Sequence, residues 1–177
     1  AYTVPSNMVA VGNGKLKSVV NNGDKSTYEW FVSNPINNYN ISVQIGNYVA
    51  IQDTLIKGDK IHDMNHYVLD YNKELASNYF TQSKEVIRFY EKYFGDYQWY
   101  EDGYKLVEVP YLGMEHQSAV TYGNGFSIYN GVRSKSWPMY GVMDPLIIHE
   151  TGHEWFGNSV TASDPTHIWI HEGLQVY

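Results

Sequence analysis

His149-Glu150-Thr151-Gly152-His153 is the most informative stretch of the sequence. Two histidines four positions apart lie one turn apart on the same face of a helix. Their imidazole nitrogens can therefore reach a single metal ion. Glu150 projects beside that face, within reach of a metal-bound water. This HExxH pattern is typical of zinc peptidase helices, and the alternative is a core helix that carries the pattern by chance.

The residues before the pattern predict where this helix begins. Asp144 is a favourable N-cap residue, and Pro145 suits the first helical position, where its missing N–H is not needed. Leu146, Ile147 and Ile148 follow as an apolar run. We therefore expect a buried helix that starts at Asp144.

Composition limits the classes of protein and of site. The chain has 177 residues, of which 43% are hydrophobic and 18% charged, as in a folded globular protein. The net charge is −7 without a basic stretch, which disfavours a nucleic-acid partner. There is no cysteine, so any metal must bind to His, Asp or Glu. No apolar run approaches the length of a membrane span, and the first residues do not have the pattern of a signal peptide; in a fragment such a signal would lie upstream.

The chain changes its periodicity near residue 71. Before it, short β-prone runs and turns predict strands, beginning with a hairpin around Asn21–Asp24. One strand is expected over Tyr48–Ile56 and another over His66–Tyr71. These strands are too few for a closed sandwich, so residues 1–71 are interpreted as the last part of a larger β-domain.

After residue 71 the pattern becomes mixed. One long amphipathic helical segment is expected from Leu75 to Phe94, ended by Gly95. Lys105–Val109 and Phe126–Tyr129 are predicted strands, the second followed by a turn at residues 130–131. A last helical segment is expected from about Ile168. We therefore predict an α+β fold with a domain boundary near residue 71.

The third metal ligand separates the HExxH classes, because catalytic zinc sites usually hold three protein ligands and one water. The metzincin pattern requires Gly and His where this chain has Phe156 and Ser159. A glutamate on a following helix is the alternative, and Glu172 is available for it. Alone, Glu172 would more often be a solvated glutamate at a helix start.

Three ordered blocks together resemble the aminopeptidase N type of zinc aminopeptidases, a gluzincin family that includes leukotriene hydrolase. His149–Thr161 reads HETGHEWFGNSVT and is similar to the family's HExxHxWFGNxVT block. Eighteen residues separate His153 from Glu172, and the block around it, Trp169–Gly173, reads WIHEG and resembles WLNEG. Upstream, Leu112–His116 reads LGMEH and resembles the GAMEN exopeptidase motif.

The resemblance implies a fold and a metal site. Residues 1–71 would be the end of the family's N-terminal β-sandwich domain, and residues 72–177 the first part of its thermolysin-like catalytic domain. His149, His153 and Glu172 would hold one Zn²⁺ ion. Glu150 would be the general base that takes a proton from the metal-bound water.

The resemblance also implies a peptide substrate with a free N-terminus. Glu115 would bind the terminal ammonium group, backbone groups around Leu112 and Gly113 would pair with the substrate, and Met114 would line its first side-chain pocket. A periplasmic, cell-envelope or secreted location is favoured over the cytoplasm. The sequence indicates no particular oligomeric state.

Several positions depart from the family pattern. Leu112 and His116 replace the first Gly and the Asn of GAMEN, which leaves the hydrogen bonding of that loop open. His171 stands where the family often has Asn, and we expect it to support the metal ligands. Glu154 is expected to orient its neighbours rather than to bind metal. His62, His66 and His167 have no motif support and are interpreted as ordinary surface or strand residues.

The family's transition-state tyrosine lies well beyond the third ligand, and Tyr177 comes too soon to take that role. The chain is therefore expected to be an excerpt of a longer peptidase, weakly active or inactive by itself. Two alternatives stay open. A gluzincin endopeptidase would share the metal site without needing Glu115. A β-rich binding module would carry a helix that only resembles a metal site.

Overall fold

The computed structural model describes residues 1–126 and 143–176. The predicted hairpin is formed by β3 (Lys15–Asn22) and β4 (Lys25–Phe31), and Gly23 in its turn has a positive φ of 65°. β1 (Tyr2–Pro5) pairs antiparallel with the other edge of β4, which gives the order β1-β4-β3. β2 (Val9–Gly12) and β5 (Val43–Gly46) form a separate antiparallel pair, and the short helix η1 (Asn38–Asn40) precedes β5.

A five-stranded mixed sheet lies at the centre, in the order β11-β12-β10-β9-β6. Its strands are β6 (Tyr48–Ile51), β9 (His66–Leu69), β10 (Leu106–Glu108), β11 (Gly113–Met114) and β12 (Val120–Tyr122). β10 runs parallel to β9 and to β12, whereas β6 and β11 are antiparallel to their neighbours. The two-residue strand β11 therefore forms one edge of this sheet.

The strand expected over Tyr48–Ile56 is two strands. β6 ends at Ile51, and β7 (Thr54–Lys57) pairs with β8 (Lys60–Asp63) in a separate hairpin. Asp53 lies at the break, where its carbonyl accepts a hydrogen bond from Met64 N at 2.9 Å. The prediction of one continuous strand is therefore wrong, because β6 pairs with β9 whereas β7 pairs with β8.

The predicted amphipathic segment is also divided. After the short helix η2 (Asp70–Asn72), α1 (Lys73–Tyr79) and α2 (Gln82–Phe94) are separated at Phe80 and Thr81. Gly95 ends α2 with φ of 93°, as expected for a glycine C-cap. The remaining helices are α3 (Pro145–Gly152), η3 (Pro165–His167) and α4 (Trp169–Val176). Among the described residues, no helix has the length and apolar character needed to cross a bilayer.

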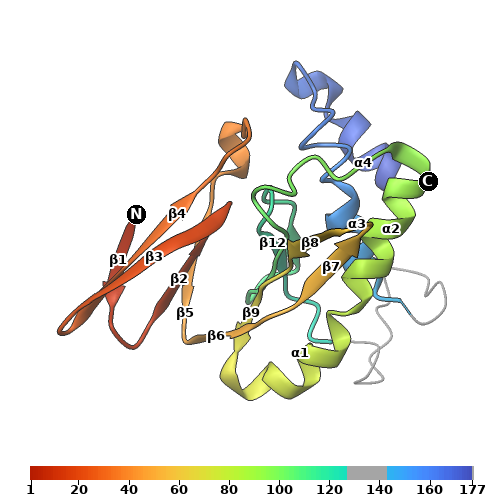
Figure 1. Cartoon of the computed structure of the whole chain (residues 1–177). Coiled ribbons are helices and arrows are strands. Elements are labelled where there is room, and N and C mark those ends of the chain that lie inside the picture. The colour runs from red at the N-terminus through yellow and green to blue at the C-terminus, as the bar shows by residue number, and fades with distance from the viewer. Residues whose placement is uncertain (127–142, 177) are drawn as a thin grey trace.

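Successive residues of the central strands bury opposite faces of the sheet. Tyr67 and Val107 belong to a core cluster with Val11 of β2, on the side of the N-terminal strands. Val68 and Leu106 belong to the larger cluster that includes α1, α2 and α3. In Figure 1 the N-terminal strands lie at the left and these helices at the right, with the sheet between them. The sheet is thus covered on both faces, which explains why its inner strands β9, β10 and β12 are almost wholly buried.

The mixed helix-and-sheet architecture confirms the predicted α+β fold. The five-stranded sheet takes β6 and β9 from before residue 71 and its other strands from after it. The domain boundary near that residue stays a prediction. Of the strand and turn predicted over residues 126–131, only Phe126 is described, and it lies in a turn with φ of 54°. The remaining residues of that prediction lie outside the described chain.

Candidate metal centre

Helix α3 begins at a buried carboxylate. Asp144 is fully buried, and its Oδ1 accepts a hydrogen bond from Leu146 N at 2.8 Å, as expected of an N-cap. Its Oδ2 accepts a hydrogen bond from Tyr122 OH at 2.7 Å and another from Tyr79 OH. The helix start is thereby joined to β12 and α1, so the direction of α3 is set by tertiary contacts as well as by its cap.

The two histidines meet as the HExxH spacing predicts. The Nε2 atoms of His149 and His153 are 3.2 Å apart. Nδ1 of His153 lies 2.9 Å from the carbonyl oxygen of Phe156, which can only accept, so this nitrogen carries the proton. Nε2 of His153 then presents its lone pair, as a metal ligand must. Burial, followed by the nearby His153, lowers the pKa of His149, which favours the neutral imidazole.

Glu172 reaches this pair from α4. Its Oε2 lies 3.3 Å from His149 Nε2, and its Oε1 lies 3.7 Å from His153 Nε2. One ligand atom from each of the three residues falls within 4.8 Å of the others. Two imidazoles and a carboxylate are the donor set of a catalytic zinc site, and no thiolate is needed. The residues present therefore fit a zinc ion.

A contact between α2 and α4 places Glu172. Tyr90 OH of α2 donates a hydrogen bond to Gln175 Oε1 of α4 at 2.7 Å. Gly152 of α3 makes room for this pair, because a Cβ there would lie 1.9 Å from Gln175 Oε1 and 2.2 Å from Tyr90 OH. Trp155 stacks on Tyr90 with ring centroids 5.1 Å apart and is buried, so it packs in the core.

Glu150 lies on the inner side of α3 and is only 7% exposed. Burial, and then the carboxylates of Glu115 and Glu172, raise its pKa to about 8. A divalent cation at the histidines would oppose this shift by supplying positive charge. Gly113 of β11 lies directly against this carboxylate, since a Cβ on Gly113 would be 2.8 Å from Glu150 Oε1.

Glu115 follows the edge strand β11 and is 8% exposed. Ligand atoms of Glu115, Glu150 and His153 all lie within 4.8 Å of one another. The structure thus brings Glu115 to the metal cluster, although 34 positions separate it from His149. Of the other predicted substrate-side residues, Gly113 and Met114 form β11 and are half-buried, and Leu112 is exposed.

His171 and Glu154 have partners that clarify their roles. His171 Nε2 accepts a hydrogen bond from Ala162 N at 2.9 Å, so the ring holds the chain that leads to α4. Glu154 Oε1 accepts a hydrogen bond from Ser118 N at 2.7 Å. Its Oε2 accepts one from Asn158 Nδ2 at 3.0 Å. The expectation that Glu154 orients its neighbours is confirmed by these contacts.

The histidines without motif support lie apart from the cluster. His66 is a buried strand residue whose Nδ1 accepts a hydrogen bond from Leu106 N at 3.0 Å. His62 stacks on Tyr100 with ring centroids 3.7 Å apart. His167 is exposed in η3.

Three residues near the Glu115 loop were not found from the sequence. Asn158 Nδ2 donates a hydrogen bond to Glu115 O at 2.9 Å. The side chain of Lys105 is buried, and its Nζ donates to Ser118 O at 2.7 Å. Burial lowers the pKa of Lys105 to about 7, while the charges of Glu154 and Asp102 oppose this. Burial, then the Glu115 carboxylate, raises the pKa of Tyr39 to about 12. In the sequence, the one sign of these contacts is the four-residue spacing of Glu154 and Asn158, whose side chains are hydrogen-bonded in the structure.

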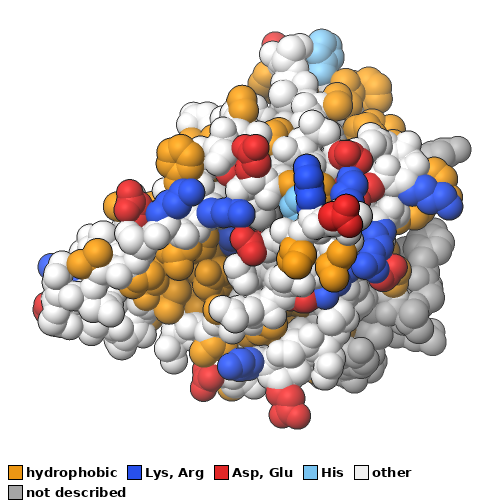
Figure 2. Space-filling view, viewed as in Figure 1, with side chains coloured by type: hydrophobic (Ala, Val, Ile, Leu, Met, Phe, Trp, Pro, Cys, Tyr) orange, Lys and Arg blue, Asp and Glu red, His pale blue; other side chains and the backbone are white. Residues whose placement is uncertain are grey.

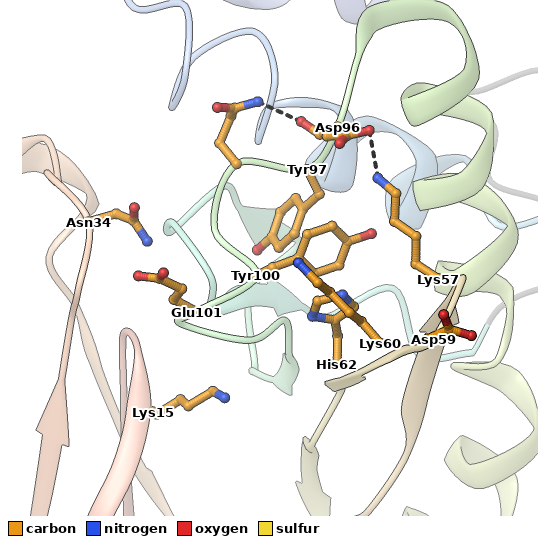
Figure 3. Close-up of a pocket in the computed structure, with 11 residues that line it drawn as sticks. Lys15, Asn34, Lys57, Asp59, Lys60, His62, Asp96, Tyr97, Tyr100 and Glu101 are labelled. Carbon is orange, nitrogen blue, oxygen red and sulfur yellow. Dashed lines mark hydrogen bonds and ion pairs between the residues drawn. The ribbon is translucent and has the colours of Figure 1, made fainter.

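A cavity of about 800 Å³ lies elsewhere on the molecule. Its lining, drawn in Figure 3, includes Lys57, Lys60 and Tyr100, and none of its residues belongs to the metal cluster. Lys57 Nζ pairs with Asp96 at 2.6 Å and with Glu91 at 2.8 Å. Figure 2 shows basic and acidic side chains interspersed on the same face. The opposite charges here largely satisfy one another, so we assign no ligand to this cavity.

Solved structures share this fold. The M1 zinc metallopeptidase from Deinococcus radiodurans matches with a TM-score of 0.78 and 18% identity, over 99% of this chain and 37% of that chain. A mutant of that protein bound to a Tyr-Ser-Ala substrate matches with a TM-score of 0.77 and 17% identity, over the same shares.

The sequence is also similar to named aminopeptidases and to the domain of one peptidase family. Aminopeptidase M1-D of Oryza sativa subsp. japonica is 24% identical over 177 residues, which are 98% of this chain and 20% of that protein. Glutamyl aminopeptidase of Rattus norvegicus is 27% identical over 176 residues, 98% of this chain and 18% of that protein. The chain thus spans about a fifth of the length of these relatives. The Peptidase family M1 domain matches residues 79–177, more than half of the chain, and the chain therefore belongs to peptidase family M1.

Proposed function

We propose that this chain provides the metal-binding part of a zinc aminopeptidase that removes N-terminal residues from peptides. The observation that carries the proposal is the convergence of His149, His153 and Glu172 from two helices, with Glu150 and Glu115 buried beside them. The three ligands would hold one zinc ion. The names of the relatives, which are aminopeptidases, support the same reaction class.

Zinc in such a site lowers the pKa of a bound water and polarises the scissile carbonyl. Glu150 would take the proton of that water and pass it to the leaving amine. A carboxylate suits this role, because it can accept a proton beside the metal and then return it. Its close contact with Gly113 keeps its carboxylate on the side of β11.

Glu115 would bind the ammonium group of the substrate. A buried carboxylate without a cationic partner among the described residues is costly, and an ammonium group offsets that cost through charge-assisted hydrogen bonds. Within the described part of the sheet, the edge strand β11 leaves backbone groups for an extended peptide to pair with. These two features together would place the first peptide bond at the metal.

The test compares peptides with a free N-terminus and the same peptides N-acetylated, using the full-length protein. An aminopeptidase cleaves the free peptides much faster. Equal cleavage of both would favour a gluzincin endopeptidase, the alternative that has no need for Glu115. Cleavage is followed by mass spectrometry of the released residues.

Metal analysis separates both peptidases from a β-rich binding module with a metal-like helix. We expect about one zinc ion per chain after mild purification, and loss of zinc in Glu172→Ala. A wild-type protein without zinc, and with no change in metal content on Glu172→Ala, would favour the binding module.

A further inference from the structure

Asn158 holds the Glu115 segment by its backbone. Its Nδ2 donates to Glu115 O at 2.9 Å and to Glu154 Oε2 at 3.0 Å, and its Oδ1 accepts from Asn40 Nδ2 at 2.5 Å. Asn158 is only 5% exposed. An amide group matches this environment, because it presents two donors and an acceptor in one plane and all are used.

The partner of Asn158 adjoins the metal site directly. Glu154 is the residue after His153, so the turn of backbone that places a ligand also places this carboxylate. Its other oxygen accepts from Ser118 N at 2.7 Å. Asn158 and Glu154 therefore connect the end of the metal helix to both ends of the segment Glu115–Ser118.

The far end of that segment has further supports. Ser118 has a positive φ of 59°, which a serine adopts only when its surroundings hold it there. Lys105 Nζ donates to Ser118 O at 2.7 Å, and Ser118 Oγ accepts from Gly14 N at 2.9 Å. With Ser118 held in this way, the remaining freedom of the segment lies near Glu115, where Asn158 is the side chain that binds its carbonyl.

We propose that Asn158 is a positioning residue for Glu115, and that it thereby determines how strongly the site prefers a free N-terminal amine. The proposal rests on the proposed function of Glu115 in binding that amine. The distance from the ammonium group to the scissile bond is short and fixed, so a small displacement of Glu115 weakens recognition without removing the metal ligands.

The experiment measures binding in a zinc-loaded, full-length Glu150→Ala background, which keeps the substrate intact. The dissociation constants of a free dipeptide amide and of its N-acetylated form are determined by calorimetry. The dissociation constant of the N-acetylated form divided by that of the free form reports recognition of the amine. We expect Asn158→Ala to lower this ratio by about tenfold, with unchanged zinc content.

Asn158→Asp sharpens the test. It keeps the shape of the side chain but turns the donor toward Glu115 O and Glu154 Oε2 into an oxygen. We expect a larger loss of the ratio than in Asn158→Ala, because three oxygens would then face one another. If a role in packing alone were correct, the isosteric Asp variant would instead be the milder one.

Two further variants complete the design. Asn72→Ala is the matched control, because Asn72 Nδ2 also donates to a carboxylate, Glu108 Oε1 at 2.6 Å, away from the Glu115 segment. It should keep the wild-type ratio. If the Asn158 variants do not fold, Asn40→Ala removes the donor to Asn158 Oδ1 and should lower the ratio by about threefold.

The outcomes distinguish the two proposals. Equal affinity of the Glu150→Ala parent for both ligands would contradict the role of Glu115 itself. A parent that prefers the free amine, with Asn158→Ala within twofold of its ratio, would overturn the positioning role and leave the aminopeptidase proposal standing. Equal weakening of both ligands by Asn158→Ala would also overturn it, since it indicates a general structural effect.

Discussion

Gly113 of the edge strand β11 leaves no room for a side chain beside the carboxylate of Glu150 on the metal helix α3. A Cβ at Gly113 would lie 2.8 Å from Glu150 Oε1 and 3.0 Å from Thr121 O. The strand can approach the helix this closely only because position 113 has no side chain. The place of the proposed general base thus depends on a residue of the opposite element.

Gly113→Ala should therefore displace Glu150 while leaving the metal ligands in place. We expect kcat to fall by about tenfold to a hundredfold with unchanged zinc content. Steady-state kinetics and metal analysis check this. Gly173→Ala is the matched control, because among the described residues its Cβ would meet only Trp169 Cε3, at 3.8 Å. Equal kinetics of the two variants would show that the contact with Glu150 does not matter.

Glu150→Ala should separate metal binding from hydrolysis. The side chain is not one of the three proposed ligands, so we expect wild-type zinc content. Loss of the general base should lower kcat by about 10²- to 10⁴-fold in the full-length protein. Normal turnover in this variant would show that another group accepts the proton.

Gly152→Ala should act on the metal through α4. Its Cβ would overlap Gln175 Oε1 and Tyr90 OH, so both side chains must shift and the Tyr90–Gln175 hydrogen bond must break. This removes a contact that holds α4, the helix that carries Glu172, and we expect zinc affinity to fall by about tenfold. Competition with a chelator of known affinity measures this. An unchanged affinity would mean that Glu172 does not depend on this contact.

His66 should make the stability depend on pH. Burial lowers its pKa to about 4; the charges of Lys84 and Lys105 act in the same direction, and Asp53 opposes them. Between pH 6.5 and 4 the unfolded chain binds more protons at this residue than the folded chain. The stabilisation is therefore complete above pH 6.5 and is lost as the pH falls, by about 2 kcal/mol between pH 8 and pH 5.

Urea unfolding of metal-free protein at these two pH values measures the effect. His66→Asn keeps an acceptor for Leu106 N and should reduce the difference in unfolding free energy by that amount. His167→Ala, at an exposed position in η3, should leave the difference unchanged. A wild-type pH dependence that persists in His66→Asn would assign it to other groups.

Much of the candidate site could be predicted because its key residues are close in the chain. The spacing of His149 and His153 needs only the period of a helix, and the cap at Asp144 needs only local backbone geometry. Glu172 and Glu115 came from the resemblance to known motifs, and the structure places both beside the histidines. The predicted hairpin at residues 15–31 was equally local.

Predictions that depended on distant partners were less successful. Residues 48–56 were predicted to form one strand, but β6 pairs with β9 while β7 pairs with β8. The helical period over residues 73–94 gave no sign of the break after Tyr79. In both places, long-range pairing and packing overrode the local pattern.

By itself, the sequence determined the helix that carries the HExxH pattern, its start and the α+β class, since periodicity, capping and composition are encoded within a few residues. Only the tertiary structure decided that Gly113 touches Glu150 and that Asn158 holds Glu115. These contacts join residues 37 and 43 positions apart, and the second also depends on Asn40, which is 118 positions from Asn158. Hydrogen bonds and close contacts between such residues arise only when separate elements pack, so no local pattern encodes them.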